Sequence, residues 1–175
     1  RGSRWANSGL VVEIHPEDVL STPTNDPLAL MNWIERLEGE SWTQARCSLR
    51  APAQRMTDFL SGRSSVDLPK SSYNMGLTPS RLDEWLPSFI TKRIQKAFQL
   101  FDRQTKGFLT AEAQLIALES RTSSPVRILR ESTSCEHPLL RGLFPCGEGA
   151  GYAGGIVSAA MDGERCAEGV ASYLG

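Results

Sequence analysis

The stretch from residue 147 to residue 156 contains the residue types that point most directly to a chemistry. Five of its ten residues are glycine, and a helical pattern begins at Ile156. Glycine allows left-handed backbone angles and close approach of the main chain to a ligand. The first N–H groups of a helix have no partner within the helix, so they attract anions. The sequence therefore predicts an anion-binding turn in front of this helix.

The spacing Gly149–Gly154, read as GAGYAG, fits the GxGxxG pattern of dinucleotide-binding turns. The complete motif also needs a second strand after the helix, which ends in an acidic residue about 20 residues further on. The sequence ends at Gly175, together with the helical pattern. We therefore reject a complete dinucleotide-binding fingerprint. A lone GxGxxG is also typical of a tight strand-to-helix turn without a ligand, so the spacing alone does not decide whether the turn binds one.

The elements expected to position this turn are a short strand at Leu143 and Phe144 and a helix that follows the glycines. Small and apolar residues recur at helical spacing on the face predicted to be buried against a sheet. They are Ile156, Ala160, Gly163, Ala167, Val170 and Leu174. Polar residues recur on the predicted solvent face: Ser158, Asp162, Arg165, Glu168 and Ser172.

Earlier segments of the sequence indicate alternating strands and helices. We expect strands over 8–14, 115–118 and 126–129, a helix from Pro27 to near Gly39 capped by Asp26, and a short helix within 50–63. Two more helices are expected to start at Thr78 and at Pro87.

One segment, AFQLFDRQTKGFLTAE, imitates a calcium-binding EF-hand, with Asp102 at the first loop position and Gly107 at the sixth. Calcium requires several oxygen ligands, but Gln104, Lys106 and Ala113 occupy three ligand positions. An EF-hand-like calcium module therefore remains only a remote alternative.

Composition excludes several classes of function. The 175 residues carry a net charge of −1, so no basic field points to nucleic acid. No apolar run approaches the roughly 20 residues that a membrane span needs. The four cysteines have no CxxC spacing, which predicts no metal site. A chain of this size and apolar content does not need disulfides, so we expect free thiols in a reducing compartment. We expect Cys146 to be a small residue that fills the end of a buried strand.

Four segments resemble FAD-dependent dehydrogenases related to the HI0933-like and glutathione-reductase-type flavoproteins. They are SRWANSGLVVEIHPED, RAPAQRMTDFLSG, LESRTSSPVRILRE and GLFPCGEGAGYAGGIVSAAMDG. The resemblance implies an α/β fold, namely the C-terminal portion of a two-domain FAD-binding (Rossmann-like) flavoprotein with part of an inserted α+β substrate or cap domain. Residues 1–112 would belong to that inserted domain, and residues 113–175 would return to the FAD-binding domain.

The same resemblance implies the site residues. Glu148 would hydrogen-bond a ribityl or pyrophosphate-side hydroxyl, and the amides from Ala153 to Ile156 would face the pyrimidine edge of the flavin. The whole cofactor-binding set would be Gly147, Glu148, Gly149, Ala150, Gly151, Tyr152, Ala153, Gly154, Gly155 and Ile156. Candidates for the substrate side are Arg121, Thr122, Ser123 and Arg55, whereas no side chain is an evident catalytic acid or base.

The function implied by the resemblance is an FAD-dependent oxidoreductase that transfers a hydride from a small organic substrate to flavin N5. A second, unknown electron acceptor would then reoxidise the reduced flavin. The N-terminal half of the same protein would supply the rest of the FAD site, so this chain alone is expected to be inactive and to bind FAD weakly or not at all. The alternative is a non-catalytic FAD-binding protein with a structural or regulatory role. Relatives occur in bacterial cytoplasm and in plastids, which leaves these two compartments open.

Overall fold

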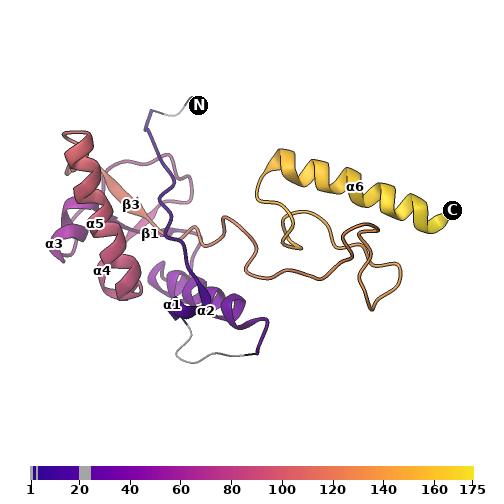
Figure 1. Ribbon diagram of the computed structural model, residues 1–175. Helices are drawn as coiled ribbons and strands as arrows, with labels where there is room; N and C mark the ends of the chain where they lie inside the picture. The colour runs from indigo at the N-terminus through magenta and orange to yellow at the C-terminus, as the bar shows by residue number, and fades with distance from the viewer. Residues whose placement is uncertain (1, 3, 20–24) are drawn as a thin grey trace. The chain divides into compact units, whose positions relative to one another are not determined.

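The computed structural model describes residues 2, 4–19 and 25–175 (Figure 1). These residues form two compact units. The first comprises the described residues up to Asp18 together with Ile34–Leu118, and the second comprises those within Val19–Trp33 together with Glu119–Gly175. The elements in chain order are α1 (Pro16–Val19), α2 (Ala29–Gln44), β1 (Ala51–Arg55), α3 (Met56–Ser61), β2 (Leu77–Pro79), α4 (Leu82–Trp85), α5 (Ser88–Gln104), β3 (Gln114–Ile116) and α6 (Ile156–Leu174).

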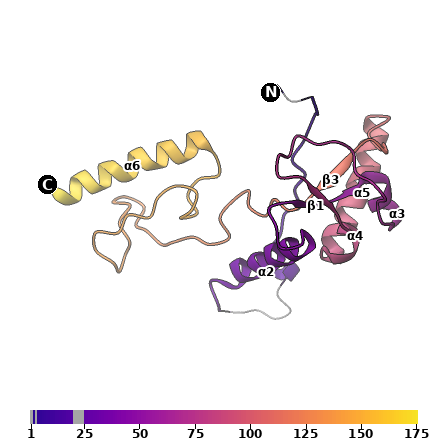
Figure 2. The ribbon, with the colours of Figure 1, turned by 180° about the vertical axis from the view of Figure 1, so that it is seen from behind.

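The first unit is built on a three-stranded mixed sheet with the order β2-β1-β3. The central strand β1 runs parallel to β2, with Ala51 opposite Leu77, and antiparallel to β3, with Ala53 opposite Ile116. Helices α3, α4 and α5 lie beside this sheet in both views (Figure 1, Figure 2). The described structure is therefore mixed α/β.

The core of the first unit forms where α5 meets α3 and α4. Ile90, Ile94 and Phe98 recur every four residues along α5 and are buried. The ring of Phe98 meets that of Phe59 edge to face, with centroids 6.2 Å apart. This spacing buries one apolar stripe of an otherwise polar helix, which is why the sequence pattern predicts the helix well.

A buried amide, Gln54, connects the sheet to the helices next to it. Its side chain is fully buried and donates hydrogen bonds to the Arg63 carbonyl (2.9 Å) and to Oδ1 of Asp83 (2.6 Å), while its oxygen accepts the N–H of Asp83 (3.2 Å). Arg81 forms an ion pair with the same carboxylate at 2.6 Å. These partners satisfy the polar atoms of Gln54, so its burial leaves none of them without a hydrogen bond.

Several sequence predictions for the helices are confirmed and others are wrong. The side chain of Asp26 accepts the N–H of Leu28 ahead of α2, as predicted, but α2 continues beyond Gly39 to Gln44. Helix α5 opens directly after Pro87, also as predicted. The helix expected from Thr78 begins later, at Leu82, because residues 77–79 pair with β1 as a strand.

The strand predictions are largely wrong. The segment 51–55, expected to be helical, is the central strand β1, and the short helix starts only after it. Of the apolar runs, only residues 114–116 form a strand, whereas 8–14, 126–129 and 143–144 are irregular. A strand needs a neighbour to satisfy its main-chain hydrogen bonds, and around 126–129 and 143–144 the described residues of the second unit offer no sheet.

Candidate functional site

The glycine loop, residues 147–155, leads directly into α6. Gly147 and Gly151 have φ angles of 73° and 83°, which confirms the prediction that glycine is needed for left-handed turns here. The N–H of Gly151 donates to the Glu148 carbonyl at 2.9 Å, and the N–H of Tyr152 donates to the Gly147 carbonyl at 3.0 Å. The loop is thus a compact, internally hydrogen-bonded turn.

The segment 124–128 holds the loop from one side. Its polar groups bind three successive loop carbonyls: Ser124 Oγ donates to Gly149 O (3.3 Å), the N–H of Ile128 to Ala150 O (3.1 Å) and Arg127 Nε to Gly151 O (3.0 Å). The Tyr152 hydroxyl donates back to the Ile128 carbonyl at 3.0 Å. These bonds engage the carbonyl groups of the loop and fix its shape.

The remaining surface of the loop is open. Glu148, Gly149, Gly154 and Gly155 are exposed, and 92% of Ile156 is exposed. Gly155, the N-cap residue of α6, provides no side-chain cap, and the first turn of the helix contains no acidic residue. The N-terminal end of a 19-residue helix therefore faces solvent beside a partly exposed glycine turn, an arrangement that suits an anionic or electron-rich group.

The predicted substrate-side residues divide between the two units. Thr122 lies beside the loop, because a Cβ placed on Gly154 would be 3.9 Å from the Thr122 carbonyl oxygen. Arg121 and Ser123 flank Thr122 on the same irregular segment. Arg55 belongs to the first unit, where its guanidinium binds Asp67 at 3.0 Å and the Ala111 carbonyl at 2.5 Å. The functional roles of all four residues stay predictions.

Helix α6 is present as predicted, but the face that it buries is different. The residues that are buried or half-buried are Ala159, Asp162, Gly163, Cys166, Gly169 and Val170. Ile156, Ala160, Ala167 and Leu174 were expected to be buried and are exposed, whereas Asp162 was expected in solvent. A charged residue faces inward because its partner lies there, which the apolar periodicity of the helix does not reveal.

The partner of Asp162 is Arg130, and the two form a buried ion pair. Their N–O distances are 2.5 Å and 2.9 Å, and the side chains are only 5% and 10% exposed. Nη1 of Arg130 also donates to the Pro145 carbonyl at 2.8 Å, and its guanidinium lies 3.6 Å from the ring centre of Tyr152. The N–H of Gly147 donates to the same carboxylate at 2.9 Å. The pair therefore ties α6 to the start of the glycine loop.

This pairing alters the acidity of both groups. The hydrogen bonds from Arg130, followed by the Gly147 N–H, lower the pKa of Asp162 to about 2 although burial opposes this. The carboxylate in turn raises the pKa of Arg130. Both groups are therefore charged throughout the neutral range.

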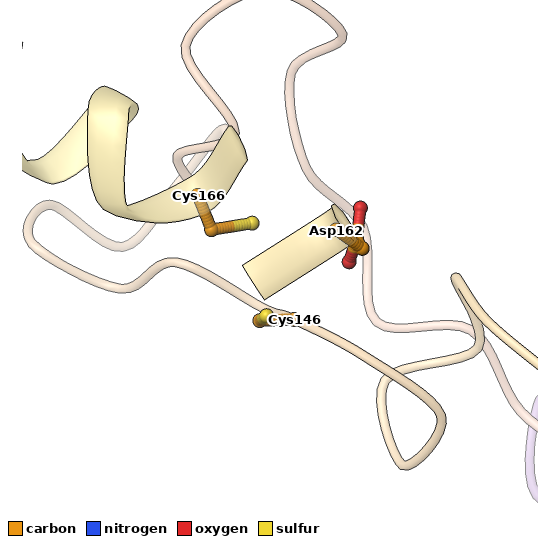
Figure 3. A group of neighbouring side chains, drawn as sticks. All are labelled: Cys146, Asp162 and Cys166. Carbon is orange, nitrogen blue, oxygen red and sulfur yellow. The ribbon is translucent and has the colours of Figure 1, made fainter. Parts of the chain in front are cut away.

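Three of the four cysteines gather beside this ion pair, and we call Cys135, Cys146 and Cys166 the thiol cluster. Cys166 (4% exposed) and Cys135 (fully buried) are buried, Cys146 is exposed, and burial followed by these two neighbouring thiols raises the pKa of Cys166. The sulfurs of Cys146 and Cys166 and one oxygen of Asp162 lie within 4.8 Å of one another (Figure 3). Cys146 was expected to fill a buried strand end, but it is exposed and lies on an irregular segment, because no strand forms there.

Reasoning from the sequence missed this cluster and Arg130. One signal was available, since Asp162 and Cys166 are four residues apart and so share a helical face. No local pattern places Cys135, Cys146 or Arg130 next to them, because these residues lie on irregular segments. The sequence also predicted no metal site; this stays a prediction, although three potential ligands meet here.

The EF-hand-like segment uses its first acidic residue within the loop. Oδ1 of Asp102 accepts the N–H groups of Gly107 (3.1 Å) and Leu109 (3.0 Å). This carboxylate oxygen therefore closes the turn after α5.

Among the described residues, no helix combines the length and the apolar character needed to cross a bilayer.

A family model and a relative match this chain. Residues 1–122 match the family model described as FAD-dependent protein, C-terminal domain-like. An uncharacterized protein of Clostridium beijerinckii (strain ATCC 51743 / NCIMB 8052) is 38% identical over 165 residues, which cover 93% of this chain and 30% of that relative. The chain thus spans less than a third of the length of the relative, and the similarity includes most of both units.

Proposed function

We propose, from the premise that this chain belongs to the FAD-dependent protein, C-terminal domain-like family, that it provides the flavin-edge part of an FAD-dependent oxidoreductase. Bound FAD would supply the redox chemistry by accepting a hydride from an organic substrate at N5 and passing the electrons to a second acceptor. The finer assignment that we propose is a two-domain, Rossmann-like flavoprotein of the glutathione-reductase type. Residues 1–112 would belong to its substrate or cap domain and residues 113–175 to its FAD-binding domain.

The observation that carries this proposal is the exposed helix end beside the glycine loop. The main-chain N–H groups from Ala153 to Ile156 would donate hydrogen bonds to the flavin edge on which negative charge develops. A helix N-terminus stabilises such charge, and its donors need no reorganisation when they are already fixed. The hydrogen bonds from 124–128 to the loop carbonyls would keep the loop in place.

Side chains around the loop would orient the cofactor and the substrate. The exposed carboxylate of Glu148 would accept a hydrogen bond from a hydroxyl of the cofactor. Thr122, beside Gly154, with its neighbours Arg121 and Ser123 would contact a small substrate, and the remaining protein would supply the other part of the site. We further propose that the protein works in a reducing compartment, either bacterial-type cytoplasm or a plastid.

The test uses the full-length protein that contains this chain. We expect the purified protein to retain FAD whose absorbance bleaches with a reductant and returns in air. Gly154→Asp places a negative charge at the helix end, where only the Thr122 carbonyl lies within 4 Å of the new Cβ, so the fold should tolerate it. We expect the variant to bind FAD at least about tenfold more weakly, because one unfavourable charge contact of about 1.4 kcal/mol has that effect.

The matched control is Gly39→Asp, which adds the same charge to α2 at a position with no neighbour within 4 Å. It should retain FAD as the unsubstituted protein does. Equal FAD affinity in both variants would contradict the placement of the flavin edge. A protein that retains FAD but never bleaches would instead have a structural or regulatory role. The 175-residue chain alone should bind FAD weakly or not at all.

A further inference from the structure

We propose that Cys146 and Cys166 are a redox-active pair that closes into an intramolecular disulfide when a small-molecule disulfide, such as oxidised glutathione, reacts with the protein. This inference goes beyond the proposed flavin chemistry and does not depend on it. It rests on the arrangement of the thiol cluster, in which an exposed thiol and a buried one lie within 4.8 Å (Figure 3).

The two thiols have complementary positions. Cys146 lies on an irregular segment and is exposed, so a dissolved oxidant can reach its sulfur. Cys166 is 4% exposed within α6, where an oxidant cannot reach it directly. Helix α6 fixes Cys166, and no more than 4.8 Å separates the two sulfurs, so a small movement of the exposed Cys146 side chain is enough to form the bond.

Arg130 makes the cluster suitable for thiolate chemistry. Its Nη1 lies 3.0 Å from the sulfur of Cys166, so a positive charge faces the position where a thiolate forms. The same guanidinium and the Gly147 N–H occupy both oxygens of Asp162. A divalent cation bound here would have to face or displace a guanidinium whose side chain is 5% exposed. The charges therefore favour a thiol–disulfide pair over a metal site.

The reaction balances in two exchange steps. The Cys146 thiolate attacks one sulfur of oxidised glutathione, the glutathione S–S bond breaks, and one glutathione leaves and takes up a proton. The Cys166 thiolate then attacks Cys146 Sγ, and the second glutathione leaves in the same way. Two protein thiols are oxidised to one disulfide, and one small disulfide is reduced to two thiols.

The second step should be the slower one. Burial, followed by the neighbouring Cys135 and Cys146 thiols, raises the pKa of Cys166 to about 12, although Arg130 acts in the opposite direction. Only a small fraction of Cys166 is then a thiolate near neutral pH. The rate of closure should rise about tenfold for each pH unit over the mildly alkaline range, in proportion to that fraction.

The experiment uses the full chain, reduced and then exposed to oxidised glutathione at several pH values. Remaining thiols are alkylated, and the denatured protein is digested with trypsin. Cleavage after Arg130, Arg141 and Arg165 leaves the three clustered cysteines on separate peptides. We expect a linked pair of peptides that contains Cys146 and Cys166, preceded by a mixed disulfide at Cys146 that disappears faster at higher pH.

Two variants of the exposed thiols provide matched controls. Cys47→Ser removes the exposed thiol outside the cluster and should leave the linked pair unchanged, whereas Cys146→Ser should abolish it and leave Cys166 reduced. A link to Cys135, or a mixed disulfide at Cys146 that persists at all pH values, would overturn the proposal. So would a zinc ion that the reduced chain retains through dialysis and that Cys146→Ser loses, since it would assign the cluster to metal binding.

Discussion

Replacing Asp162 with asparagine should selectively loosen α6 and the glycine loop. The substitution preserves shape and an acceptor for the Gly147 N–H, but it removes the charge that faces Arg130. Lowering the pKa of this carboxyl from 3.8 to about 2 corresponds to about 2–3 kcal/mol at neutral pH, since each unit of pKa is worth about 1.4 kcal/mol. A buried guanidinium without its counter-charge adds to this loss, so about 2–4 kcal/mol is expected.

The assay must report on α6 and the glycine loop, and tryptophan fluorescence does not, because residues 119–175 contain no tryptophan. Hydrogen exchange followed by mass spectrometry resolves the peptides of α6 and of the loop. A loss of 2 kcal/mol corresponds to amide exchange about 30-fold faster, when exchange tracks local opening. Glu168→Gln, the same type of change at an exposed position of α6, should alter exchange little.

The pH dependence provides the sharper test. A carboxyl with a lowered pKa in the folded state contributes stability that is fully present above its unfolded value, 3.8, and is lost as the pH falls through about 2. The difference between the protein and Asp162→Asn should therefore be constant from pH 7 to about 5 and shrink to less than half by about pH 2.5. Equal exchange in Asp162→Asn and Glu168→Gln at neutral pH, or a difference that does not shrink in acid, would refute this reasoning.

Two glycine substitutions test the packing around the loop and α6. Gly151→Ala should destabilise the second unit by more than about 1 kcal/mol, because φ is +83° and the new Cβ would lie 2.6 Å from a main-chain oxygen. The control Gly149→Ala has no such contact and should be nearly neutral. Thermal unfolding followed by circular dichroism measures both. Gly169→Ala should loosen α6 because its Cβ would overlap the Ser134 carbonyl oxygen. The control Gly163→Ala, whose Cβ would have its nearest neighbour at 3.9 Å, should stabilise the helix slightly. Equal rates of hydrogen exchange in α6 of the two variants would contradict this packing.

The sequence predicted the parts of the fold that local pattern controls. Helix α5 follows from apolar spacing after a proline, and the presence of α6, though not its buried face, follows from the helical pattern after the glycines. The left-handed angles of Gly147 and Gly151 follow from residue type. Strand β1 was missed because its Ala-Pro-Ala-Gln-Arg sequence has no strand signature, and its partners lie over 20 residues away.

The site was predictable only in part for the same reason. The glycine loop is visible as a run of one residue type, but the Arg130–Asp162 pair joins residues 32 positions apart. The inward direction of Asp162 depends on this distant partner, and so does the gathering of Cys146 and Cys166. Periodicity describes how one helix divides its residues between two faces, but it does not show what the neighbouring segment brings to them.

The burial of Arg130 also determines where a protease can cut the folded protein. Trypsin must take an arginine side chain into its own pocket, and this one is 5% exposed and stacked on Tyr152. Arg121, Arg127 and Arg141 are exposed on either side of it. Brief digestion under native conditions should therefore spare the bond after Arg130 while cutting at its neighbours. The rate at which fragments cut after Arg130 appear would measure how often the buried ion pair opens.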